Sequence, residues 1–183
     1  MKHGRMEART ATIRTVTLTP HPASPQSPIK ALRVDIDTSG SDLRLQFVAE
    51  GDIRSLDWEE GGIPGRTDEL WRHTCFEAFL AGSDGYVEFN LAVEGQWASY
   101  HFSSYREGMR LAEQTATQPV ASGSGYDGIL MVESWLQVPS GSSRLGLSAV
   151  LEAVDGTISY WALAHPSARP DFHHPDSFIL DLP

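Results

Sequence analysis

Apolar and polar residues alternate with a period of two in several parts of the chain. Successive side chains of a strand point to opposite faces of a sheet, so this spacing predicts strands with one buried face. No window of a dozen residues has the spacing of an amphipathic helix. The sequence therefore predicts an all-β protein, and its clearest apolar runs are Leu32, Val34 and Ile36; Leu43, Leu45 and Phe47; Val87, Phe89 and Leu91; and Leu145, Leu147, Ala149 and Leu151.

Turn-forming segments separate these runs, among them DTSGSD at 37–42 and PSGSS at 139–143. Their residues tolerate tight or left-handed backbone. Two longer stretches are expected to be irregular: 55–70, which is rich in glycine, and 111–125, which is rich in Ala, Thr, Ser and Gln. Short strands joined by turns, without intervening helices, predict an antiparallel β-sandwich. No internal repeat or linker is evident, so residues 1–183 are expected to form a single domain.

Two short loops predict the register of a central ribbon of strands. The loop GSDG at 82–85 is expected to pair Ala81 with Tyr86, which adds a strand at 75–81.

The second loop is the dipeptide EG at 94–95, which predicts a tight hairpin that pairs Val93 with Gln96. Glu88 should then lie opposite His101. Both hairpins predict the same two faces, and a one-residue slip in either would exchange them. The apolar face is expected to hold Phe76, Ala78, Leu80, Val87, Phe89, Tyr100 and Phe102, and the polar face Cys75, Glu77, Phe79, Glu88, Asn90, Trp97, Ser99 and His101.

The predicted polar face has the residue types of a saccharide site. Asn90 is the only asparagine in the chain and stands where a strand disfavours it. Carboxylates and a planar amide match paired sugar hydroxyls, while the indole of Trp97 could pack against a sugar ring. The alternative is a plain solvated sheet face, since antiparallel sheets often expose polar residues on one side. Such a domain would serve protein interaction or scaffolding.

Charge and cysteine content exclude several classes of partner. The formal net charge is −10, and the 14 basic residues form no run. Such a surface repels phosphate backbones and anionic membranes, so we expect neither nucleic acid nor membrane as a partner. The single Cys75 cannot form an intramolecular disulfide, and the N-terminal segment 1–15 lacks the apolar core of a signal peptide. We therefore expect a cytoplasmic protein of unassigned oligomeric state.

Three segments resemble a known family: DELWRHTCFEAFL at 68–80, YVEFNLAVEGQWASYHFSSYREGM at 86–109 and YWALAHPSARPDFH at 160–173. They are similar to bacterial DOMON-like domains related to family 9 carbohydrate-binding modules. The subgroup is the one named after the flavin reductase of peptidoglycan precursor synthesis. This resemblance implies an immunoglobulin-like or jelly-roll β-sandwich that binds a ligand without catalysis, sugars in some relatives and haem in others.

The resemblance also marks individual residues. Arg106 could bind an acidic group of a ligand or pair with an acid such as Glu88. The ligand-binding set that we predict is Glu77, Glu88, Asn90, Trp97, His101 and Arg106. The positions that match the family pattern are Trp71, Glu77, Glu88, Asn90, Trp97, Tyr105, Arg106, His165, Asp171 and His173.

Three other chemistries have weaker support. Glu77 and Glu88 could form the carboxylate pair of a glycosidase, but diagonal Glu pairs occur in many sheets and nothing in the sequence marks one of the two for a raised pKa. Haem would need a Met and a His on one iron, and the candidates have no specifying spacing. Metal-ligand spacing is also missing, so no cofactor and no metal are predicted. The candidate haem ligands are Met109, Met131, His101, His165 and His173, and the candidate metal ligands are His73, Asp171, His173 and His174.

Overall fold

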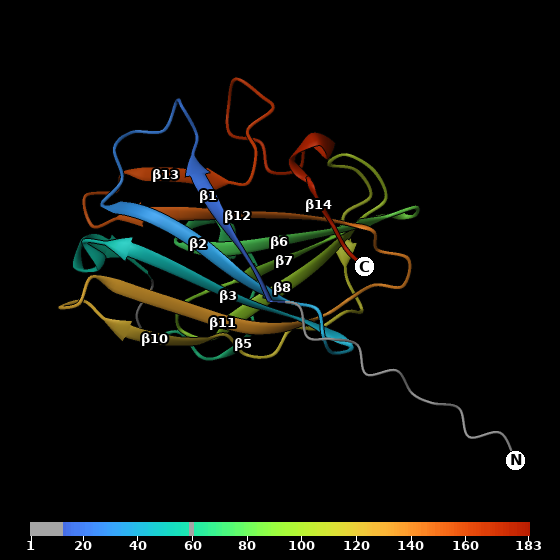
Figure 1. The fold of residues 1–183 in the computed structure, drawn as a ribbon, viewed down its shortest axis with the longest axis horizontal. Coiled ribbons are helices and arrows are strands. Elements are labelled where there is room, and N and C mark those ends of the chain that lie inside the picture. The colour runs from blue at the N-terminus through green and yellow to red at the C-terminus, as the bar shows by residue number, and fades with distance from the viewer. Residues whose placement is uncertain (1–12, 59–60) are drawn as a thin grey trace, which may run out of the picture.

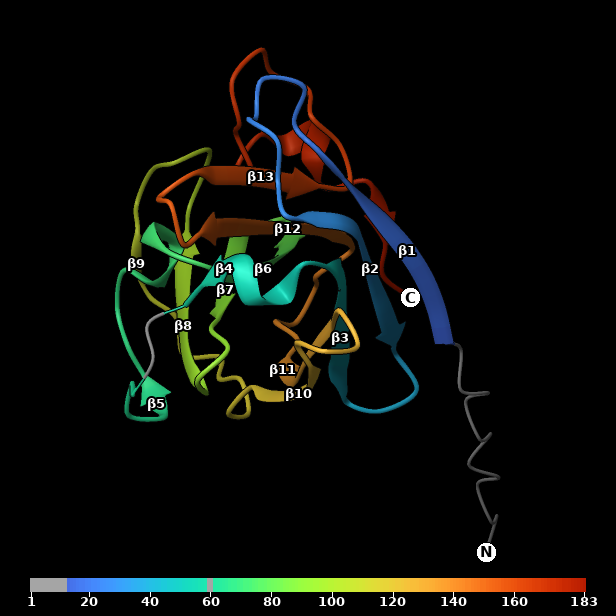
Figure 2. The same cartoon turned by 90° about the vertical axis from the view of Figure 1, so that its left-hand side faces the viewer.

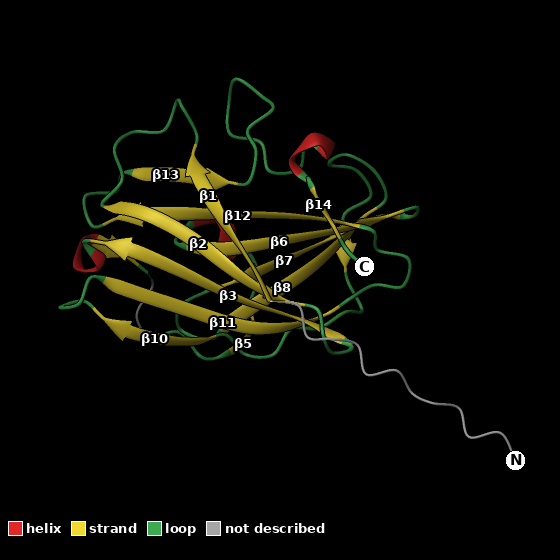
Figure 3. Cartoon of the chain, viewed as in Figure 1, coloured by secondary structure: helices red, strands yellow, loops and turns green. Residues whose placement is uncertain are grey.

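The computed structural model describes residues 13–58 and 61–183. The first twelve residues, which include most of the segment expected to lack a signal peptide, lie outside the described part. Strands dominate, and the helices are single 3-10 turns (Figure 3). The strands are β1 (Ile13–Pro20), β2 (Ile29–Asp37), β3 (Asp42–Gly51), β4 (Leu56–Asp57), β5 (Gly65–Arg66), β6 (Cys75–Gly82), β7 (Gly85–Leu91), β8 (Gln96–Phe102), β9 (Arg110–Leu111), β10 (Val120–Ser124), β11 (Ile129–Gln137), β12 (Arg144–Ala153), β13 (Ile158–Ala162) and β14 (Leu180–Asp181); the turns are η1 (Ile53–Ser55), η2 (Leu70–Arg72) and η3 (Pro175–Ser177).

The strands hydrogen-bond into one curled, mixed sheet in the order β10-β11-β3-β2-β1-β13-β12-β6-β7-β8-β5 (Figure 1). Strand β1 joins the two halves because it pairs with β2 along most of its length and with β13 at its end. The pairs are antiparallel except for β5 and β8, which run parallel. The all-β prediction is confirmed, whereas an exclusively antiparallel sheet is wrong for this short edge pair.

The curl brings β2, β3 and β11 across from β6, β7 and β12, with the main core between them (Figure 2). Phe47 of β3 and Phe76 of β6 meet there with ring centroids 5.1 Å apart. The alternating positions that predicted β2, β3, β7 and β12 all supply buried side chains to this core. Hydrophobic burial on one side of each strand therefore selects these elements.

The predicted register is confirmed for one hairpin and wrong for the other. Ala81 lies opposite Tyr86, and Glu77 lies opposite Asn90, as the GSDG loop predicts. Between β7 and β8, however, Glu88 lies opposite Tyr100 rather than His101. The β8 strand is thus shifted by one residue from the predicted pairing.

Glycine conformation explains the shift. The β7–β8 loop has three residues rather than two, because Ala92 N–H donates to the Gln96 carbonyl at 2.9 Å. Gly95 closes the turn at a φ of 86°, and its N–H donates to the Ala92 carbonyl at 3.3 Å. A turn followed by a left-handed glycine is a common three-residue hairpin. The dipeptide EG therefore belongs to a longer loop that also contains Val93.

The predicted irregular stretches hold three short strands. The described residues of the segment 55–70 form β4 and β5, with the end of η1 at Ser55 and the start of η2 at Leu70. In contrast, 111–125 includes β10, an edge strand that pairs with β11. Its sequence VASGS has no apolar alternation, so only the partner strand selects its conformation. No helix in the described residues is long and apolar enough to cross a membrane.

Replacing Gly95 tests the origin of the register. We expect Gly95→Ala to lower the free energy of unfolding by about 1–2 kcal/mol, because alanine resists left-handed backbone. Gly40→Ala is the matched control, since the nearest atom to its added methyl group would lie 3.7 Å away in ordinary contact. Urea denaturation of both variants measures the difference. Equal stability of the two variants would contradict the assignment of the turn.

Candidate functional site

The outer face of the β6–β7–β8 ribbon carries a second cluster of buried side chains. Most of it is aromatic, and the C-terminal segment supplies Phe178 to it. Two carboxylates, Glu77 and Glu88, lie in the same face at 2% and 4% exposure. The shifted register of β8 produces this composition, because it turns Tyr100 and Phe102 toward Glu88. The cluster contains Phe79, Tyr86, Ala98, Tyr100, Phe102 and Phe178.

Asn90 holds the carboxylate of Glu88 in place. Its side-chain amide donates to Glu88 Oε1 at 2.8 Å, and its carbonyl oxygen accepts from the Cys75 thiol at 3.4 Å. Asn90 is fully buried. Both Asn90 and Glu88 project from the same side of β7, two residues apart, so the amide reaches along its own strand. The only asparagine of the chain thus positions an acid.

Glu77 is fixed from the neighbouring strand. The hydroxyl of Ser148 on β12 donates to Glu77 Oε2 at 2.7 Å. This serine pairs directly with Glu77 across the two strands. Glu77 and Glu88 are diagonal neighbours on adjacent strands. Such positions are roughly 7–8 Å apart, with their β-carbons somewhat closer, which is within reach of long side chains.

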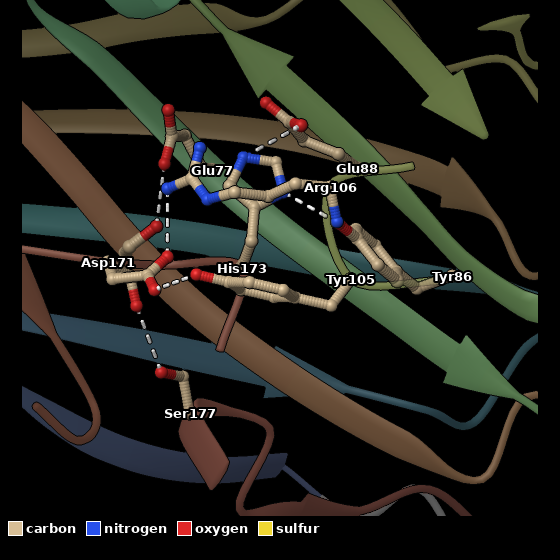
Figure 4. A network of polar contacts seen from close by, with 9 residues as sticks. Glu77, Tyr86, Glu88, Tyr105, Arg106, Asp171, His173 and Ser177 are labelled. Carbon is tan, nitrogen blue, oxygen red and sulfur yellow. Dashed lines mark hydrogen bonds and ion pairs between the residues drawn. The ribbon is translucent and has the colours of Figure 1, made fainter. Parts of the chain in front are cut away.

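His173 reaches the same face from the C-terminal segment and lies among aromatic rings. Its ring centroid is 5.1 Å from that of Phe102 and 5.3 Å from that of Phe79. The hydroxyl of Tyr86 lies 2.7 Å from His173 Nδ1, and His173 Nε2 lies 3.7 Å from Glu88 Oε2 (Figure 4). Tyr86 also accepts the N–H of Arg106 at 3.2 Å, so its own proton is free for Nδ1.

Arg106 links the loop after β8 to the C-terminal segment. Its guanidinium donates to Asp171 Oδ1 at 2.8 Å, and the Tyr105 hydroxyl donates to Asp171 Oδ2 at 2.6 Å (Figure 4). Arg106 has a φ of 56°, a left-handed conformation that strains a non-glycine residue. Its N–H bond to Tyr86 and its pairing with Asp171 hold it there. The two segments therefore form one cover over the acidic face.

A cavity of about 650 Å³ lies beneath this cover. Glu77 and Glu88 line it from the sheet, and aromatic and apolar side chains form much of its wall. Its volume falls within the range of small-molecule sites, which is roughly 300–1,000 Å³. The complete lining is Trp71, Glu77, Glu88, Phe102, Arg106, Met109, Val150, Tyr160, Arg169, Pro170, Phe172 and His173.

Burial favours the uncharged forms of the groups at the cavity floor. It raises the pKa of Glu77, with a further rise from the charge of Glu88, while the Ser148 hydrogen bond acts in the opposite direction. Burial also raises the pKa of Glu88 against the hydrogen bond from Asn90. The pKa of His173 falls to about 4 for the same reason of burial. The floor thus accepts added positive charge more readily than negative charge.

The structure brings together four of the six predicted ligand-binding residues: Glu77, Glu88, Asn90 and Arg106. Asn90 lies behind the floor and does not line the cavity. The predicted placement of Trp97 and His101 on this face is wrong because of the register shift.

Trp97 packs instead against the main core on the other face, with the Arg66 guanidinium 5.1 Å from its ring centroid. His101 pairs with Val87 on that other face, and its Nε2 lies 3.1 Å from the Asp84 carbonyl oxygen. Neither side chain lines the cavity.

The structure also places the other residues that the sequence singled out. Trp71, Asp171 and His173 belong to the site or its cover, whereas His165 lies apart, with its Nε2 2.7 Å from the Thr19 carbonyl oxygen. Arg106 pairs with Asp171 rather than Glu88. Among the candidate haem ligands, Met109 and His173 line the cavity and Met131, His101 and His165 do not. The described residues contain no group of three side chains suited to a metal ion.

The sequence did not indicate several residues of the site. Tyr86, Ser148, Tyr160, Arg169 and Phe172 come from different strands and from the C-terminal segment, and only the fold brings them together. A signal existed for Tyr86, because the correctly predicted β6–β7 pairing already places it on the face of Glu88.

The sequence matches no family model and no curated protein. The resemblance to DOMON-like domains therefore stays a prediction that rests on the three quoted segments.

The raised pKa of Glu77 implies that the stability of the protein depends on pH. Its folded-state pKa lies above the ordinary value of 4.5, so the free energy of unfolding should decrease as pH rises through the interval between them. Glu77→Gln removes this titration. We expect the melting temperature of the variant, relative to the wild type, to increase by at least ~4 °C between about pH 5 and about pH 8.

Thermal unfolding at several pH values measures this effect. His173 also titrates, but it is present in both proteins and its contribution cancels in the difference. The exposed Glu113 provides the control variant Glu113→Gln. If the melting temperatures of Glu77→Gln and the wild type differ by the same amount at every pH, the raised pKa of the Glu77 carboxyl is contradicted.

Proposed function

We propose that the protein is a non-catalytic binding module for a small saccharide or saccharide-like molecule, held in the cavity over the β6–β7–β8 ribbon. The observation that carries this proposal is the combination of a 650 Å³ cavity, two buried carboxylates at its floor and aromatic walls. Carboxylates accept hydrogen bonds from sugar hydroxyls, and aromatic rings pack against the C–H face of a sugar ring. The aromatic side chains available to pack against a sugar ring are those that line the cavity, which do not include Trp97: Trp71, Phe102, Tyr160 and Phe172.

The finer fold assignment belongs to the same proposal. We infer a β-sandwich of immunoglobulin-like or jelly-roll type, related to DOMON-like domains and family 9 carbohydrate-binding modules, in a cytoplasmic protein. The two halves of the curled sheet that enclose the main core support this inference. Opposed antiparallel sheets around a shared core are the architecture of such sandwiches.

A scaffolding domain without a small ligand is the second candidate. The sequence raised it because the polar sheet face could simply be solvated. Glu77 and Glu88 are instead buried under a cover, which favours a pocket over an open interaction surface.

Thermal shift across mono- and disaccharides, amino sugars and cell-wall precursors tests the proposal. A ligand at 100-fold its dissociation constant should stabilise the protein by ~2.7 kcal/mol, which corresponds to ~5–10 °C in melting temperature. Flat melting curves across the whole panel would support the scaffold instead.

A pair of tryptophan variants locates the binding. Trp71→Ala should weaken binding of any sugar found in the panel by about 10-fold or more, because an aromatic contact in a desolvated pocket contributes strongly. Trp135→Ala is the matched control, since Trp135 is 39% exposed on β11 and does not line the cavity. Isothermal titration calorimetry measures both. Equal affinities in the two variants would place the ligand elsewhere.

A further inference from the structure

Among the described residues, the acids at the cavity floor have no lysine or arginine within ion-pair distance, although the charge of Arg106 lowers the pKa of both. His173 Nε2 lies 3.7 Å from Glu88 Oε2, and its pKa of about 4 makes His173 neutral at pH 7. A buried carboxylate is costly unless it holds a proton or meets a positive charge.

One oxygen of Glu77 is also without a hydrogen-bond donor. Ser148 donates to Oε2, whereas no described residue donates to Oε1. Only 2% of the Glu77 surface is exposed to solvent, and the residue lines the cavity. The unpaired oxygen of a nearly sealed side chain therefore borders the space that a ligand would fill.

The two arginines of the cavity compensate for these acids only in part. The charge of Arg106 lowers the pKa of both acids, but burial still raises the pKa of each above its ordinary value. Arg106 donates to Asp171, whose other oxygen accepts from Tyr105. Arg169 is exposed to solvent. Burial thus outweighs the influence of Arg106 and disfavours the ionised forms of both acids. A neutral hydroxyl group on a ligand would supply hydrogen bonds but no positive charge to stabilise those ionised forms.

We propose that the ligand carries a primary amine, and that its ammonium group binds between Glu77 and Glu88 at the cavity floor. An ammonium group has three donors, enough to reach Oε1 of Glu77 and one oxygen of Glu88 from a single position. Charge-assisted hydrogen bonds of this kind are about twice as strong as neutral ones. The inference rests on the binding function proposed above and narrows its ligand class to amine-bearing molecules such as amino sugars.

Two pairs of probes that differ only in this group test the inference: glucosamine against glucose, and benzylamine against benzyl alcohol. Calorimetric titration into the full chain should give glucosamine an affinity at least ~10-fold higher than that of glucose. Glu77→Gln keeps the side chain's shape and removes its charge. It should weaken glucosamine binding by ~10-fold and change glucose binding by less than ~2-fold.

Glu113→Gln is the control with the same chemistry on an exposed residue outside the cavity. Glu88→Gln is a second, independent test, and it should weaken glucosamine binding as Glu77→Gln does. A circular-dichroism melt of each variant shows that it is folded before titration.

The outcomes separate the two proposals. Glucose that binds as tightly as glucosamine, or glucosamine binding that neither glutamine variant weakens, would overturn the amine inference and leave the saccharide function intact. Benzylamine binding without either sugar would support the amine inference and reject the saccharide. No binding by any of the four probes would count against both.

Discussion

Burial of two carboxylates on one face of a sheet is the constraint that organises this molecule. A charge removed from water must be protonated, hydrogen-bonded or paired. Asn90 and Ser148 stabilise the two buried carboxylates in part, because each donates a hydrogen bond to one of them. The charge of Arg106 stabilises the ionised forms further, and protons or a ligand supply the rest. The polar side chains around the floor therefore serve to position Glu77 and Glu88 rather than to neutralise them.

The same ribbon serves two different interiors. On β7, Phe89 enters the main apolar core while Asn90, its neighbour, enters the acidic face. Alternation along a strand makes this division unavoidable, since successive side chains point to opposite sides. Strands β6 and β7 are thus buried on both faces, one face apolar and the other aromatic and acidic. A rigid, doubly covered ribbon is a suitable base for a site that needs fixed geometry.

The cover over the site depends on contacts between distant parts of the chain. Arg106 and Asp171 are joined by an ion pair, and Tyr86 connects the Arg106 backbone with His173. The strained backbone of Arg106 is compatible with this arrangement because both its N–H and its guanidinium have fixed partners. The cavity wall is therefore built from loops, whereas its floor is built from strands.

The sequence by itself determined the strands with apolar alternation and the β6–β7 pairing, because a period of two and a turn of defined length act locally. It also marked Glu77, Glu88 and Asn90 as neighbours on one face. The tertiary structure decided the rest. The left-handed Gly95 shifted β8 by one residue, which exchanged Trp97 and His101 for Tyr100 and Phe102. The C-terminal segment then covered that face, and long-range contacts of this kind leave no period or motif in a sequence.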